Sequence, residues 1–304
     1  MTSVVVPGAL ADRLEPLLGT RVRSGTATVG GHSNLVFMCT AADGTPVVVK
    51  AATTPWKRAD IEREAAVLEV LADGSVPVPE LVGRSADDDW AVLVTRRLEG
   101  RNGLSILADL RVDDDMAVAT GRLLARVLRL VHHSAPRPLV GEQFDRARQV
   151  ELLAKPLETC GAPDDVIQSV GSALSHVVHG RGVAFVHGDP GLHNLLWGTE
   201  SDVLTVRCLM DWEMAGWGNP LSDVAWVWWT FALRDLPRAA FDAFAGEYGV
   251  GPIRALGWAD DTVDAVVRAQ MGSLLVRTEP GTALRDIWID RIRNLSALPP
   301  LQRQ

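Results

Sequence analysis

Short apolar runs alternate with turn residues in the first third of the chain, a pattern typical of β-strands. Two such runs within residues 26–51 flank the turn AADG, and its Asp43-Gly44 step is typical of a β-hairpin. A buried strand is predicted at 91–95 (AVLVT). Between them, residues 58–72 repeat apolar side chains at helical spacing, so we expect a helix there with Asp60 as its N-cap.

Beyond these elements the pattern becomes mostly helical. Residues 113–133 begin with three acids, which suits the positive end of a helix, and continue with an apolar stripe. A short strand at 183–186 leads into a polar loop, and a second hairpin follows around the turn GTESD. A β-rich first third before a helical remainder predicts an α+β fold with two lobes, residues 1–96 and residues 97–304.

Composition and charge narrow the class of protein. Of the 304 residues, 47% are hydrophobic and 22% are charged, as is ordinary for a soluble globular protein. The longest strongly apolar run, 224–233, is shorter than the roughly 20 residues that cross a bilayer, and the N-terminus lacks the basic region of a secretory signal. We therefore expect a cytoplasmic protein without membrane contact. The net charge of −8 argues against coating nucleic acid, and three scattered cysteines form no disulfide framework.

The densest polar segment is HGDPGLHN, residues 187–194, directly after an apolar strand. Asp189 and Asn194 lie five apart, and Asp211 ends the next apolar strand in LMDWE. Phosphoryl transfer from a nucleotide needs such a set, because one carboxylate accepts the proton of the attacking hydroxyl while an amide oxygen and another carboxylate hold Mg²⁺. A polar turn between two strands is the alternative interpretation of the loop alone.

A lysine and a glutamate in the first third predict an ion pair. Lys50 ends the apolar run VVVK, and Glu64 falls on the apolar face of the predicted helix at 100° per residue. A carboxylate turned toward a core is costly unless it is paired, so Lys50 is its expected partner. A lysine that reaches solvent beside a boundary glutamate is the alternative.

Paired glycines, Gly30 and Gly31, precede Ser33 and Asn34 between the first two predicted strands. Glycines there let backbone N–H groups approach phosphate oxygens, and Ser33 adds a hydroxyl donor. An ordinary glycine turn is the alternative.

Several aromatic and imidazole side chains are expected to be structural. Trp226 and Trp229 lie three apart on a predicted helix and should pack in the core, with a stacking wall for a substrate as the alternative. His132 and His133 end a helix, where imidazolium suits the helix dipole. His187 is expected to brace the polar loop rather than donate a proton.

Taken in order, the Gly-rich hairpin, VVVK, REAAVLEVLA, LVTRRLEG, HGDxxxxN, MDWE and GNPLSDVAW resemble the aminoglycoside phosphotransferase and choline kinase family. The resemblance implies a protein-kinase-like fold, with a small nucleotide-binding lobe and a larger helical lobe that carries the catalytic loop and the acceptor site. It implies a kinase that uses ATP or GTP and Mg²⁺ to phosphorylate an antibiotic, aminoglycoside-like or otherwise sugar-containing. A metabolic kinase for a sugar or an amino alcohol is the alternative within the same fold.

The same resemblance implies roles for individual residues. Asp189 is the implied general base, and Asn194 and Asp211 are the implied Mg²⁺ ligands. His187 and Asp223 would support the catalytic loop. The implied nucleotide-binding residues include a hinge at 95–98 and are Gly30, Gly31, Ser33, Asn34, Lys50, Glu64, Arg96 and Leu98.

The loop departs from the family pattern in two respects. Pro190 follows Asp189, and the loop holds no lysine, so His193 is the candidate cation beside the transferred phosphoryl group. A distant alternative is a metal-dependent hydrolase with His187, Asp189 and His193 as ligands, and another is a kinase-like module without catalysis. A hydrolase has no use for a strand lysine paired with a helix glutamate. We expect a monomer or weak homodimer whose partner is a small-molecule acceptor.

Overall fold

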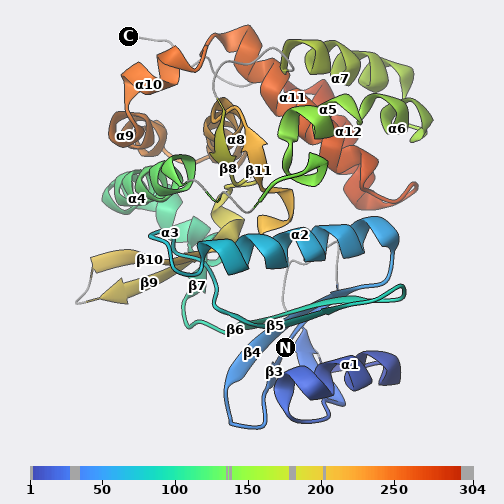
Figure 1. Cartoon of the computed structure of the whole chain (residues 1–304). Helices are drawn as coiled ribbons and strands as arrows, with labels where there is room; N and C mark the ends of the chain where they lie inside the picture. Colours follow the sequence, from blue (N-terminus) through green and yellow to red (C-terminus); the bar gives the residue numbers. More distant parts are fainter. Residues whose placement is uncertain are drawn as a thin grey trace.

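The computed structural model describes residues 3–27, 35–134, 136, 139–177, 183–200 and 203–295. A six-stranded antiparallel sheet occupies the first third of the chain, and helices make up most of the remainder (Figure 1). The predicted α+β fold, with a small β-rich lobe and a larger helical lobe, is confirmed.

The sheet orders its strands β1-β2-β3-β4-β6-β5. Helix α1 (Gly8–Leu18) packs on one face together with Val47 and Val49, while α2 (Pro55–Leu71) covers the other face. Because side chains alternate along a strand, Lys50 points to the α2 face. Figure 1 shows α2 between the sheet and the helical part. The strands are β1 (Ser3–Val5), β2 (Ser24–Ala27), β3 (Leu35–Thr40), β4 (Pro46–Ala52), β5 (Leu81–Ala86) and β6 (Ala91–Arg96).

Helix α2 begins three residues earlier than predicted, at Pro55, where the fixed proline φ suits a first helical turn. The expectation that Asp60 is the N-cap is wrong. Asp60 lies inside the helix and is only 4% exposed. Its carboxylate accepts hydrogen bonds from Arg63 (2.9 Å) and from Arg277 (3.0 Å), which comes from the far end of the chain. The sequence alone does not distinguish an acid that caps a helix from an acid that forms an ion pair with an arginine far away in the chain.

The helix predicted at 113–133 is α4 (Asp114–His133), and the carboxylate of Asp113 accepts the N–H of Met116 as its N-cap. The helix α3 (Leu107–Val112), which was not predicted, precedes it. One continuous apolar core joins α2 to these helices. Among the described residues, none of the helices has the length and apolar character that spanning a membrane requires. The helices are α3 (Leu107–Val112), α4 (Asp114–His133), α5 (Arg146–Glu151), α6 (Ala154–Thr159), α7 (Asp164–Val177), α8 (Leu221–Leu233), α9 (Arg238–Tyr248), α10 (Val250–Ala255), α11 (Asp260–Val276) and α12 (Ala283–Arg293).

Two small sheets position the polar loop. The predicted strand and second hairpin are both present, and the hairpin pairs Leu195 with Leu209. The backbone N–H of Met210 donates to the carbonyl of Asn194 (2.7 Å), so the residues at the base of this hairpin are neighbours. The short elements are β7 (Arg101–Asn102), β8 (Ala184–Val186), β9 (Leu195–Glu200), β10 (Val203–Leu209), β11 (Gly216–Gly218) and the 3₁₀ helices η1 (Gly103–Ile106), η2 (Glu142–Phe144), η3 (Leu192–Asn194) and η4 (Trp212–Met214).

Candidate active site

The loop after β8 is fixed by a buried carboxylate at the start of α8. Asp223 has no exposed surface and accepts the backbone N–H groups of His187 and Gly188, each at 2.8 Å. Gly188 has φ +87°, and a Cβ there would lie 2.3 Å from the carbonyl oxygen of Met214. Glycine is therefore required at this point of the loop.

The Asp223 carboxylate has a third donor from α4. The Nε2 atom of His132 lies 3.0 Å from it, and the Nδ1 atom lies 2.8 Å from the hydroxyl of Tyr248. Burial opposes ionisation of Asp223, but the contacts with His132 and the loop outweigh it and hold its pKa below the ordinary value. His132 is structural as expected, although its partner lies far along the chain and was not foreseen.

Three side chains hold the carboxylate of Asp189. The indole N–H of Trp226 donates to Oδ1 (2.6 Å), while Nδ2 of Asn194 and Nε2 of His193 each lie 3.1 Å from Oδ2. Burial opposes ionisation of Asp189, but His193 and Trp226 outweigh it, so its pKa lies below the ordinary value. Trp226 is buried as predicted, and its hydrogen bond to Asp189 is a role that the sequence did not indicate.

Lys50 lies among three carboxylates between the two lobes. Its Nζ atom is 2.6 Å from Glu64, 2.5 Å from Asp211 and 3.1 Å from Glu213, which confirms the predicted contact between Lys50 and Glu64. Burial opposes the charge of Lys50, but the carboxylates outweigh it and raise its pKa. For Glu213, burial outweighs the attraction of Lys50 and raises the pKa to about 7. Three carboxyl groups thus contact one lysine in this cluster.

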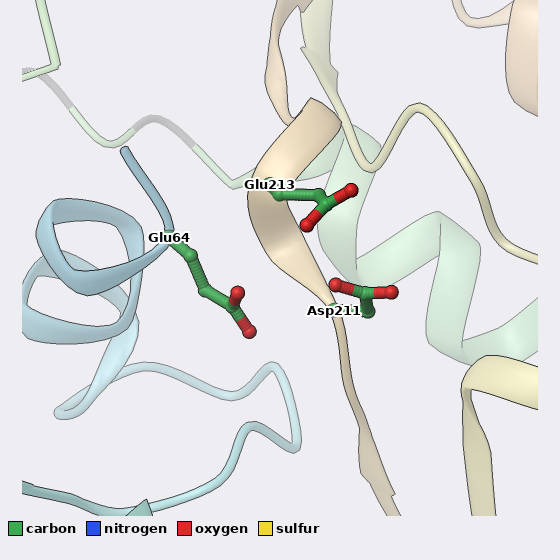
Figure 2. A group of neighbouring side chains, drawn as sticks. All are labelled: Glu64, Asp211 and Glu213. Atoms are coloured by element: carbon green, nitrogen blue, oxygen red, sulfur yellow. The ribbon is translucent and has the colours of Figure 1, made fainter. Parts of the chain in front are cut away.

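The three carboxylates point toward one another, Glu64 from α2 and the other two from the segment at η4 (Figure 2). One oxygen of each lies within 4.8 Å of the others, close enough to share a metal ion. Sequence reasoning missed Glu213, although the motif DWE showed a second acid two residues after Asp211.

Asn194 lies beside this cluster at the base of the β9–β10 hairpin. Its Nδ2 atom donates to the backbone oxygen (2.8 Å) and to the side chain of Asp189. Within the described part of the chain its Oδ1 atom accepts no hydrogen bond, so it is free to bind a cation. The structure thus brings Asp189, Asn194 and Asp211 into one site.

The other predicted nucleotide-binding residues fall into two groups. Gly30, Gly31, Ser33 and Asn34 lie outside the described residues. The side chain of Arg96 forms an ion pair with the carboxylate of Glu80 (2.6 Å). The backbone N–H of Arg96 donates to the backbone carbonyl of Glu80. The backbone of Leu98 makes no hydrogen bond among the described residues, so it remains able to contact a nucleotide base.

The histidines do not form the metal site that a hydrolase would need. Both ring nitrogens of His187 are engaged, Nε2 with the carbonyl of Met210 (2.9 Å) and Nδ1 with the N–H of Asp189 (3.2 Å). Nδ1 accepts a hydrogen bond only in the neutral ring, and burial, which lowers the pKa of His187, favours the same form. No ring nitrogen of His187 is left to ligate a metal ion, which removes the basis of the hydrolase interpretation.

The two-lobed fold and this site define a protein-kinase-like phosphotransferase, and comparison with known proteins agrees. A family model, the phosphotransferase enzyme family, matches residues 25–259. Viomycin phosphotransferase of Streptomyces vinaceus is 26% identical over 263 residues, which cover 82% of this chain and 80% of that protein. The chain belongs to the phosphotransferase enzyme family.

Solved structures share the fold at low sequence identity. An aminoglycoside-3'-phosphotransferase of type VIII has a TM-score of 0.66 and 21% identity, over 88% of this chain and 99% of that one. The GDP complex of aminoglycoside 2'-phosphotransferase-IIIa has a TM-score of 0.68 and 15% identity, over 94% and 96%. The expected protein-kinase-like fold is thereby confirmed.

Proposed function

We propose that the protein transfers the γ-phosphoryl group of ATP or GTP to a hydroxyl group of a small molecule, with Asp189 as the general base. The observation that carries this proposal is the carboxylate of Asp189, held ionised by Trp226, His193 and Asn194 at the junction of the lobes. The likeness to viomycin phosphotransferase supports an antibiotic as the acceptor, and the GDP bound to the structural neighbour supports a nucleotide donor.

Asp189 would act on the acceptor. Its donors fix the direction of both oxygens, so one lone pair can take the proton of the attacking hydroxyl as the bond to phosphorus forms. Burial lowers the pKa of His193, but the neighbouring carboxylate of Asp189 raises it by more, so the net shift is upward. His193 would therefore supply positive charge beside the transferred group. Asp223 and His187 would support the loop and not touch substrate.

Lys50 would act on the donor. It is the cation nearest to Asp211, and we propose that it binds the α- and β-phosphates while Glu64 keeps it oriented. The hinge residues Arg96 and Leu98 would meet the base. The lobe boundary after residue 96 belongs to the same proposal, as do the phosphate contacts of Gly30, Gly31, Ser33 and Asn34.

The residues present fit Mg²⁺. Asn194 and Asp211 offer an amide and a carboxylate oxygen, the hard ligands that this ion prefers, and Glu213 offers another. When bound, Mg²⁺ offsets phosphate charge during transfer.

The test is ADP or GDP release by wild-type protein and Asp189→Asn across a panel of antibiotics and sugars. We expect kcat to fall by about 10²–10⁴-fold with little change in nucleotide affinity, because a base acts on the acceptor proton. Asp109→Asn is the matched control, since that carboxylate pairs with Arg101 at the surface. Full activity of Asp189→Asn would refute the assignment.

A further inference from the structure

The carbonyl oxygen of Gly188 is held from outside its loop by a helix in the last part of the chain. Gln270 of α11 is buried, and its Nε2 atom donates to this carbonyl (2.5 Å). The carbonyl belongs to the planar peptide unit that joins Gly188 to Asp189, so its direction also sets the direction in which Asp189 leaves the peptide. Gln270 therefore acts on the peptide unit directly before the proposed base.

The opposite side of the same peptide unit is also bound. Its N–H, that of Asp189, donates to Nδ1 of His187 (3.2 Å). Gly188 has φ +87°, and a glycine has access to many other backbone conformations, so the chain itself does not hold this peptide plane in one direction. A rotation of the plane would break both hydrogen bonds and would move the carboxylate of Asp189 with it.

An arginine fixes which end of the Gln270 amide faces the loop. The Oε1 atom of Gln270 accepts a hydrogen bond from Nη2 of Arg146 in α5 (2.8 Å). A guanidinium donates and does not accept, so Oε1 must face Arg146 and Nε2 must face Gly188. Arg146 packs closely on β11, where a Cβ at Gly218 would lie 2.9 Å from the Cβ of Arg146, and β11 pairs with β8, which leads into the loop. Hydrogen bonds thus connect α5 through α11 to the peptide before Asp189.

We propose that Gln270 is a positioning residue for phosphoryl transfer, which fixes the peptide between Gly188 and Asp189 while Arg146 keeps its amide in the donating orientation. This rests on the proposed function, in which Asp189 accepts the proton of the acceptor hydroxyl. Gln270 and Arg146 act through Asp189 and not on the substrate. A displacement of about 1 Å in a reacting group can cost about a hundredfold in rate, so a contact that fixes the base bears directly on kcat.

Two variants of Gln270 remove its donor in different ways. Gln270→Met keeps the length of the side chain and removes both polar atoms. Gln270→Glu keeps oxygens that pair with Arg146 but, as a carboxylate, has no proton to donate to Gly188, and it is the second variant should Gln270→Met fail to fold. We expect kcat to fall by about ten- to hundredfold in each, with the KM for the nucleotide within about twofold of wild type.

The indole N–H of Trp226 reports the position of Asp189 without any turnover, because it donates to Oδ1 of that residue (2.6 Å). Its NMR signal is observed in protein with isotope-labelled tryptophan and is identified by its loss in Trp226→Phe. We expect the signal to shift in both Gln270 variants.

Two controls separate this role from a general effect on the helices. Ser273→Ala removes a buried hydroxyl one turn further along α11, which has no hydrogen-bond partner in the described part of the chain. Arg293→Gln changes the net charge by the same amount as Gln270→Glu, but at the surface, where Arg293 pairs with Asp165 (2.7 Å). Both controls should keep the kcat and the Trp226 signal of wild type.

An unmoved Trp226 signal or an unchanged kcat in the Gln270 variants overturns the proposal. A lower Tm without a lower kcat overturns it too, since Gln270 would then serve folding alone, as does an equal loss of kcat in Ser273→Ala. Failure of the proposed function is seen separately, as full activity of Asp189→Asn, because the Trp226 signal reports the contact between helix and loop whether or not Asp189 is the base.

Discussion

Removing the buried carboxylate of Asp223 should lower the free energy of unfolding by more than removing a carboxylate at the surface. Asp223→Ala leaves the N–H groups of His187 and Gly188 buried without an acceptor. Each such group costs about 1–3 kcal/mol, so we expect the free energy of unfolding to fall by about 3–5 kcal/mol. Asp223→Asn keeps one acceptor oxygen and should lose about 1–3 kcal/mol.

The assay is urea unfolding followed by tryptophan fluorescence, with Asp242→Asn as the control. Asp242 pairs with Arg238 on an exposed helix face, where an ion pair contributes about 0–1 kcal/mol. In thermal melts the loss for Asp223→Ala corresponds to a Tm fall of roughly 6–20 °C. If Asp223→Ala unfolds within about 1 kcal/mol of wild type, the two N–H groups have another partner and the reasoning is refuted.

The pH dependence gives an independent check. The pKa of Asp223 in the folded chain lies below its ordinary value, since the contacts of His132 and the loop outweigh burial. Its contribution to stability is therefore present above the ordinary value of 3.8 and is lost as pH falls through the lower folded pKa. The stability gap between wild type and Asp223→Asn should narrow in acid, and a gap that widens there would contradict this account.

Two further predictions concern charges at the junction of the lobes. The pKa of Glu213, raised by burial from 4.5 to about 7, means that the folded chain holds a proton the unfolded chain has lost; stability should fall by about 3 kcal/mol as pH rises through that window. Glu213→Gln should make this slope shallower in urea unfolding without nucleotide, while Glu64 and Asp60, whose pKa values burial also raises, still contribute to it. An identical slope in both proteins would contradict the prediction. Arg277→Gln should lower the free energy of unfolding by about 1–3 kcal/mol, because Asp60 keeps Arg63 but loses its second donor. Urea unfolding beside Arg293→Gln measures this, and equal loss in the two variants would argue against a buried role for Arg277.

The parts of the site that sequence could predict depend on local periodicity. Lys50 ends an apolar run, and helical spacing puts Glu64 on the apolar face of α2, where a carboxylate needs a cation, so the sequence predicts the contact between the two. The spacing of Asp189, Asn194 and Asp211 within a strand–loop–hairpin pattern likewise predicted one site.

The remainder depends on contacts between distant segments. The helical spacing of Trp226 predicts core packing, with a stacking wall as the alternative, but it does not predict the hydrogen bond to Asp189, which depends on how α8 passes the loop. Asp60 has the sequence position of a helix N-cap, whereas its partner Arg277, which follows the last residue of α11, lies far away in the sequence and could not be foreseen.

Helix α11 links the loop after β8 to helix α2 from outside the part of the chain that the family model matches. Its Gln270 donates to the carbonyl of Gly188 in the catalytic loop (2.5 Å), and two turns later the chain presents Arg277 to Asp60 of α2. Asp60 and Glu64 lie one turn apart on α2, so they share a face. The same helix therefore touches the loop that carries the proposed base and the helix that orients Lys50. We therefore expect substitutions at Gln270 or Arg277 to change how the loop after β8 lies relative to α2, although neither residue is among the proposed substrate-binding residues.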